Sequence, residues 1–232
     1  MDKTYKISRH QYLRDIEPFK SKYIPSNSLF FKVLPGIGAT TYELEALRHS
    51  IILVSNLPVI IGKSKQIEFK DIIQPVYEGI KEDDILEYLE KDEVIYKKII
   101  TTPESFVKVI NAINASDFNL HEDFFILFDE CEKIIQDIDF RKAIELPMID
   151  FFNFKNKAFI SATPIVPSDP RFKDAGFTNI ILKPTFDYSI PIKLQPTNNV
   201  LYALKKFLEN THRERYFIFF NSTDNIAELI KS

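Results

Sequence analysis

The chain has 232 residues, of which 45% are hydrophobic and 27% are charged, enough for one sizeable core or for one domain and part of another. One cysteine and four scattered histidines exclude a disulfide framework and a cysteine-rich zinc site, and no apolar run approaches the roughly 20 residues that span a bilayer. The net charge of −3 argues against a small basic DNA-binding module, although local contacts to a nucleic-acid backbone stay open.

Short apolar runs alternate with helix-patterned segments along most of the chain. The expected strands are Phe30–Leu34, Ile51–Ser55, Ile95–Ile100, Phe124–Phe128 and Lys157–Ile160. The expected helices are about Thr40–Arg48, Glu82–Leu89 and Pro103–Ile113. Because the strands are apolar throughout, they indicate a parallel sheet that is buried on both faces. The predicted fold class is therefore α/β, with ligands bound at the carboxyl ends of the strands.

The tail of the chain reads as the start of a second unit. Ile190–Leu194 is a strand or a linker, Asn198–Glu209 is a helix and Tyr216–Phe220 is a strand, after which one short helix follows. One strand and two helices cannot enclose a core of their own. We therefore predict a first domain over residues 1–195, followed over residues 196–232 by a linker and the truncated start of a second domain.

The segment Pro35–Thr41 lies between an expected strand and an expected helix. Glycines in such a loop let backbone N–H groups close around phosphates, the helix N-terminus adds a favourable field, and a threonine hydroxyl can bind Mg²⁺. Compared with the pattern G-x-x-x-x-G-K-[ST], Gly38 and Thr40 match, while Val33 and Ala39 replace the first glycine and the lysine. By itself the segment is equally consistent with a simple glycine turn. The candidate phosphate-binding residues are Gly36, Ile37, Gly38, Ala39, Thr40 and Thr41.

Two acids, Asp129 and Glu130, follow the most apolar expected strand. One carboxylate at a strand end can hold Mg²⁺, mostly through water, and its neighbour can orient an attacking water. The alternative is a pair of acids at the start of a helix, where negative charge is favourable in any protein.

Asp129–Glu132 resembles the D-E-x-D/H box of superfamily 2 helicases. Four further segments resemble motifs of that family in its chain order: Ser55–Pro58, Thr101–Ser105, Ser161–Pro164 and Phe217–Ser222. The third is similar to the S-A-T motif, and the last is similar to the strand that opens the family's second RecA-like domain. Each match alone has an alternative, such as a turn, a helix start or a strand end with small residues. Their common order favours the family.

The resemblance implies a RecA-like P-loop NTPase sandwich that uses ATP and Mg²⁺. Thr40 and Asp129 would bind the metal, and Glu130 would position water for catalysis. The residues that would couple ATP state to nucleic-acid grip are Glu132, Ser161, Ala162 and Thr163. Those that would contact the DNA or RNA backbone, without reading sequence, are Ser55, Asn56, Thr101, Thr102 and Ser105. Because ATP would lie between two RecA-like domains, the chain is expected to need its second domain, or a larger assembly, to unwind a duplex.

Ala39 departs from the family, since a lysine there normally meets the ATP phosphates. Its loss predicts weak ATP binding and slow hydrolysis. Lys63 or Lys65 could compensate; the alternative for both is an ordinary exposed loop lysine. Glu132 also departs from the usual Asp or His.

A second hypothesis follows from Ala39. The chain could be a helicase-like scaffold that binds nucleotide or nucleic acid without catalysis. Because no apolar run is long enough to span a bilayer, we expect no membrane partner under either hypothesis. With a polar N-terminus and a single cysteine, we expect a cytoplasmic or otherwise intracellular location, a phage or other viral source included.

Overall fold

The structure, a computed structural model, describes residues 2–17, 19–20, 23–130, 145–163, 169–191, 196–210, 218 and 223–231. It divides into two compact units, residues 1–187 and 188–232, and each is described by itself. In the second unit, α9 (Val200–Glu209) matches the expected helix, and α10 is Thr223–Lys231. The expected strand Tyr216–Phe220 and the segment Phe217–Ser222 lie outside the described residues apart from Ile218, so the second domain stays a prediction.

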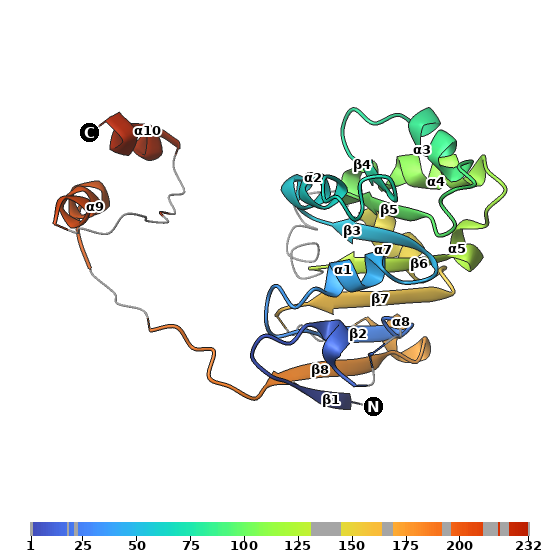
Figure 1. The fold of residues 1–232 in the computed structure, drawn as a ribbon, viewed down its shortest axis with the longest axis horizontal. Coiled ribbons are helices and arrows are strands. Elements are labelled where there is room, and N and C mark those ends of the chain that lie inside the picture. Colours follow the sequence, from blue (N-terminus) through green and yellow to red (C-terminus); the bar gives the residue numbers. More distant parts are fainter. Residues whose placement is uncertain are drawn as a thin grey trace. The chain divides into compact units, whose positions relative to one another are not determined.

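Within the described residues, eight strands form one sheet in which every pairing is parallel. The strands are β1 (Asp2–Ile7), β2 (Ser28–Phe31), β3 (His49–Val54), β4 (Ile73–Val76), β5 (Lys98–Thr101), β6 (Phe124–Asp129), β7 (Asn156–Ser161) and β8 (Thr178–Pro184). Figure 1 shows them side by side in the order β1-β8-β2-β7-β6-β3-β5-β4. The predicted class, an α/β sandwich around a mostly parallel sheet, is confirmed.

Short helices connect these strands. In the first unit they are η1 (Leu13–Asp15), α1 (Ala39–Leu44), α2 (Leu57–Ser64), α3 (Glu82–Leu89), η2 (Pro103–Ser105), α4 (Phe106–Asn114), α5 (Leu120–Asp123), α7 (Glu145–Phe151) and α8 (Pro170–Asp174). Among the described residues, no helix is long and apolar enough to cross a membrane.

The sheet is buried on both faces, as its apolar strands predict. Along β6, Phe124, Ile126 and Phe128 pack into one core cluster, whereas Phe125 and Leu127 pack into another. The first cluster includes side chains from α3, α4, α5, α7 and α8, and the second includes side chains from η1, α1 and α2. Helices therefore cover the two faces in two layers, and the strand ends remain at the edges.

Two boundaries differ from the sequence prediction in ways that matter for the site. The expected strand Phe30–Leu34 ends already at Phe31, so Lys32 and Val33 belong to the following loop. The expected helix Thr40–Arg48 ends at Leu44. Glu43, near the end of the shortened helix, belongs to a set of charged and polar side chains that includes Arg48 and Lys98.

That set anchors the end of α1 to the amino ends of β3 and β5. Arg48 Nη2 lies 2.6 Å from Glu43 Oε2, and the Ser50 hydroxyl donates to Glu43 Oε1 at 2.6 Å. The buried ammonium of Lys98 donates to the Glu43 carbonyl at 2.9 Å and to Ser50 Oγ at 3.1 Å. Burial lowers the pKa of Lys98 to about 8. Since all these groups have partners, they fix the end of α1 that lies away from the loop to strands β3 and β5.

Candidate functional site

The carboxyl ends of five strands bring the predicted motifs to one edge of the sheet. Phe31 pairs with Ser161, Asp129 pairs with Val54, and Leu53 pairs with Thr101. The order β2-β7-β6-β3-β5 therefore places the predicted phosphate loop at one side of this edge. The predicted nucleic-acid contacts lie at the other side, with the acidic pair between them.

The loop after β2 has the backbone of a tight turn. Gly36 and Gly38 have φ angles of 73° and 77°, in the left-handed region that glycine adopts at little cost. Val33, which stands where the usual pattern has its first glycine, has a φ of 58°. A branched residue is strained there by about 1–2 kcal/mol. Val33 therefore has a left-handed backbone conformation that glycine would adopt without this strain.

Six successive amides of this loop are available to an anion. Within the described residues, the N–H groups of residues 36–41 donate no hydrogen bond to the protein. The helix that follows the loop is shorter than predicted, because α1 has only six residues. The Ala39 methyl group is buried in the core beside Tyr42 and Leu44. No cation therefore comes from position 39.

Asp129 lies at the centre of the edge and accepts hydrogen bonds from two sides. The Thr40 hydroxyl donates to its Oδ2, and the Lys32 ammonium lies 3.1 Å from its Oδ1. The side chains of Lys32 and Asp129 are 9% and 7% exposed, so the ion pair is nearly excluded from water.

Sequence reasoning missed Lys32, since it falls inside the expected strand Phe30–Leu34. The signal that could have found it is a lysine within an apolar run, because a buried lysine requires a partner.

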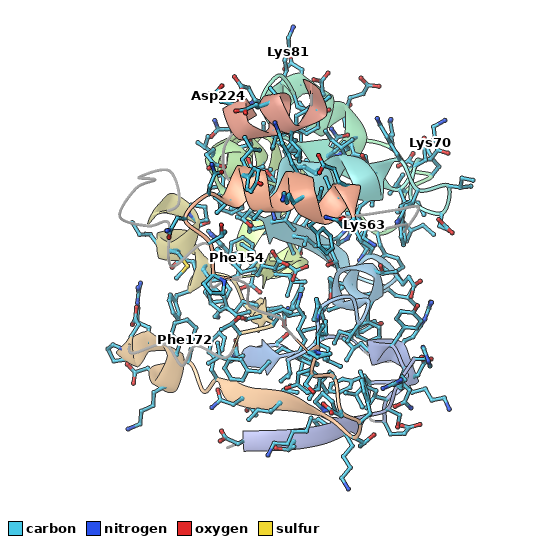
Figure 2. The ribbon with its side chains drawn as sticks, turned by 90° about the vertical axis from the view of Figure 1, so that its left-hand side faces the viewer. Lys63, Lys70, Lys81, Phe154, Phe172 and Asp224 are labelled. Atoms are coloured by element: carbon cyan, nitrogen blue, oxygen red, sulfur yellow. The ribbon has the colours of Figure 1, made fainter. Side chains whose placement is uncertain are left out.

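Of the two lysines considered from the sequence, only one contacts the loop. Lys63, which is labelled in Figure 2, donates to Thr41 Oγ1 at 2.7 Å from helix α2. Lys65 is exposed and has no hydrogen bond to the loop within the described residues.

Both lysines line a hollow of about 580 Å³ beside the loop, together with Tyr12 and Gly38. A Cβ atom on Gly38 would lie 3.4 Å from Tyr12 Cδ1, so the ring lies close over the loop backbone. Ligand sites for small molecules fall in this size range.

The site can supply few metal ligands by itself. Within the described residues, no group of three or more His, Cys, Asp and Glu side chains could hold a metal ion. Asp129 and Thr40 could provide two oxygen ligands, a number that would suit Mg²⁺ if phosphate and water oxygens completed its shell. Glu130 follows at once and is half-buried, with a φ of 57° that is unusual for a residue other than glycine. Cys131 and Glu132 lie outside the described residues.

The segment after β7 folds back on itself next to the loop. The Thr163 amide donates to Ser161 Oγ at 2.9 Å, and this hydroxyl donates to the Thr163 carbonyl. The Lys32 amide donates to the Ser161 carbonyl at 2.8 Å, so the two predicted segments are joined through the backbone. Ala162 lies within this turn, and Pro164 lies outside the described residues.

The predicted nucleic-acid contacts differ in accessibility. Asn56 is exposed and Thr102 is half-buried, whereas Thr101 and Ser105 are buried and present little surface. The hydroxyl oxygen of Ser55 is buried and has no hydrogen-bond partner in the part of the chain that the structure describes. Only part of the predicted set could therefore touch a nucleic acid in this conformation.

No protein-family model and no curated protein matches the sequence. Among solved structures, the chain is similar to a DEAD box protein from Methanococcus jannaschii, at 17% identity and a TM-score of 0.45, over 89% of this chain. It is also similar to the Hef helicase domain of Pyrococcus furiosus, at 14% identity and a TM-score of 0.44, over 79% of this chain. This chain covers 63% of the first structure and 42% of the second.

Proposed function

We propose that the chain is the nucleotide-binding half of a nucleic-acid-dependent ATPase, either a helicase or a translocase. The observation that carries the proposal is the meeting of Asp129 with Thr40 and Lys32 beside a loop of unpaired amides. Such an edge offers two metal ligands, a cation and a row of N–H donors, which together suit a polyphosphate. The sequence motifs around it suggest which polyphosphate, namely ATP.

The residues of the site then divide into distinct roles. The amides of residues 36–41 would hold phosphate oxygens, and Thr40 and Asp129 would hold Mg²⁺. The metal would supply charge neutralisation on the phosphates when bound. The hollow lined by Tyr12 is large enough for a base and ribose, with the ring available for stacking. Glu130 would orient a water molecule toward the phosphate.

Nucleic acid would contact the opposite side of the same edge. Asn56 and Thr102 are the accessible candidates, and the unpaired Ser55 hydroxyl can turn toward a phosphate oxygen. Thr101 and Ser105 are buried, so they would stabilise the carboxyl end of β5 instead of contacting nucleic acid. Coupling between the two sides would pass through Ser161, Ala162 and Thr163, with Glu132 as a further candidate. These contacts would read no sequence, and they fit DNA and RNA equally.

A complete motor would require more than this chain provides. In the proposed family, ATP lies between two RecA-like domains, and the second supplies arginines to the γ-phosphate. The isolated chain is therefore expected to bind nucleotide but not to unwind a duplex. A second domain or a larger assembly is the partner that the proposal requires.

A catalytically impaired scaffold is the second candidate, and Ala39 is the observation that favours it. A domain without the usual lysine could sense nucleotide, or dock nucleic acid, without turnover. The intact Thr40–Asp129–Glu130 group favours the enzyme instead, since a scaffold has no need of a water-positioning acid.

The test is ATP hydrolysis by the chain, and by any longer protein that contains it, with and without single-stranded DNA or RNA. Glu130→Gln is the matched variant, because it removes the charge and keeps the shape. We expect the isolated chain to bind nucleotide, and the longer protein to hydrolyse ATP in a manner that nucleic acid stimulates and that Glu130→Gln abolishes while nucleotide binding persists. In the longer protein, nucleotide binding without turnover would support the scaffold, and the absence of both would refute both functions.

A further inference from the structure

We propose that Lys32 supplies the phosphate-binding ammonium that the chain lacks at position 39. The proposal rests on the proposed nucleotide-binding function and assigns a residue to it. Lys32 directly follows β2, which ends at Phe31, and directly precedes Val33, whose φ is 58°. The cation would thus come from the strand end that precedes the loop, instead of from the helix that follows it.

The location of the ammonium supports this assignment. Lys32 Nζ and the Thr40 hydroxyl bind the two oxygens of one carboxylate, that of Asp129. Thr40 is the neighbour of Ala39 in the chain, so the positive charge of Lys32 lies close to the position where the usual pattern has its lysine. The Lys32 amide is held by the Ser161 carbonyl at 2.8 Å, which fixes the start of the side chain.

Stability alone is a poor reason for this ion pair. Removing two charges from water is costly, and a buried salt bridge commonly stabilises a fold no better than apolar side chains of the same size. Lys32 and Asp129 are nevertheless nearly excluded from water at the ligand-binding edge of the sheet. A lysine at such a place is better explained by a ligand than by the core.

The shared carboxylate also suggests how the lysine changes partner. Asp129 and Thr40 are the proposed Mg²⁺ ligands, and a divalent cation beside Asp129 would repel the ammonium. The flexible lysine would then release Asp129 Oδ1 and donate to a phosphate oxygen. Without nucleotide, the same ammonium neutralises the buried Asp129 carboxylate. The two states need only a change of side-chain conformation.

The other two lysines near the loop are weaker candidates. Lys63 donates to Thr41 Oγ1 and lines the hollow, on the side of the loop where the base is proposed to lie. Lys65 is exposed on the same rim. Both can contribute general attraction, whereas Lys32 alone contacts the metal-binding carboxylate. Lys63 is therefore the matched control for Lys32.

The experiment measures binding of a fluorescent ADP analogue to the full chain, with competition by unlabelled ATP, ADP and adenosine. Lys32→Gln should weaken ATP and ADP roughly tenfold to a hundredfold, since a charged hydrogen bond is lost, and leave adenosine unchanged. Lys63→Gln should weaken them less than about threefold. Equal nucleotide affinity in Lys32→Gln and the wild type would overturn the proposal, as would an equal loss for adenosine. No nucleotide binding by the wild type would instead refute the proposed function.

A second comparison covers the case in which Lys32→Gln does not fold, as judged by circular dichroism. Lys32→Gln combined with Asp129→Asn removes both buried charges, and Asp129→Asn alone serves as its reference. The binding of ADP to both variants is measured in EDTA, where no Mg²⁺ is bound and the proposed metal role of Asp129 cannot affect the result. A further loss of ADP affinity of about tenfold in the double variant supports the assignment, and identical affinities overturn it.

Discussion

Lys98 makes the stability of the fold rise with pH, whereas a lysine whose pKa is raised by an ion pair makes stability fall as pH rises. Its ammonium is nearly excluded from water, where it donates to the Glu43 carbonyl and to Ser50. Burial lowers its pKa from 10.5 to about 8. Between these values the unfolded chain holds a proton that the folded chain has released. Stability therefore rises with pH across this window, because the unfolded state binds more protons.

The size of the effect follows from the two pKa values. The full shift corresponds to about 3 kcal/mol, and the linkage relation gives a rise of roughly 1.4 kcal/mol between pH 7 and pH 9. Above about pH 10 the trend reverses, since burial raises the pKa of Tyr88 above its ordinary 10.0 and the folded state then keeps a proton that the unfolded state loses. The interval from pH 7 to pH 9 is thus the informative one.

The assay is urea unfolding of the wild type and of Lys98→Met at pH 7, 8 and 9. Burial also lowers the pKa values of Lys97 and Lys157, so the diagnostic quantity is the difference between the two proteins. We expect that difference to grow in favour of the wild type by about 1–2 kcal/mol over the interval. Lys173→Met, at an exposed lysine, is the control and should show no pH-dependent difference. A flat difference for Lys98→Met would refute the reasoning.

Two further predictions concern the loop. Thr40→Val removes the hydroxyl that donates to Asp129, so nucleotide affinity should fall roughly tenfold with Mg²⁺ and stay unchanged in EDTA, as a titration in both buffers would show; an equal loss in both would contradict the metal role. Gly38→Ala should lower the free energy of unfolding by about 1–2 kcal/mol because of its φ of 77°. Gly62→Ala, with open space inside helix α2, should instead raise it by about 0.5–1 kcal/mol in the same urea assay. If both substitutions changed the free energy of unfolding in the same direction, the backbone conformation of Gly38 would not be the cause.

The sequence predicted the central strands well because their signal is local. Phe124–Phe128 and Lys157–Ile160 are apolar throughout, and β6 and β7 extend them by only one residue at one or both ends. The acidic pattern of Glu82–Leu89 likewise gave helix α3 with the correct ends. Each of these segments is determined by its own composition, so no knowledge of the neighbouring elements was needed.

The edges of the sheet could not be predicted in the same way. β1 is rich in polar residues, and β4 contains Pro75, so neither reads as a strand. Each pairs with a single neighbour among the described strands. β1 pairs with β8, which lies far away in the chain, and β4 pairs with β5.

The site shows the same division between local and long-range information. Gly38, Thr40 and Asp129 could be picked out by spacing, since each stands at a strand or helix end. The contact of Lys32 with Asp129 joins residues 97 positions apart, and no local pattern encodes it. Nor could spacing reveal that Thr101 and Ser105 are buried, because that depends on the helices packed around them.

The strand order has a consequence for biosynthesis. β7 lies between β2 and β6 although it follows both in the chain, so Lys32 and Asp129 acquire their spacing only after Asn156–Ser161 has inserted between their strands. The N-terminal strand β1 can pair only after its partner β8 (Thr178–Pro184) has been synthesised, which is later still. A nascent chain on the ribosome therefore exposes unpaired apolar strands until late in translation, a condition that slows folding and favours aggregation. For recombinant expression, a useful C-terminal boundary must lie beyond Pro184.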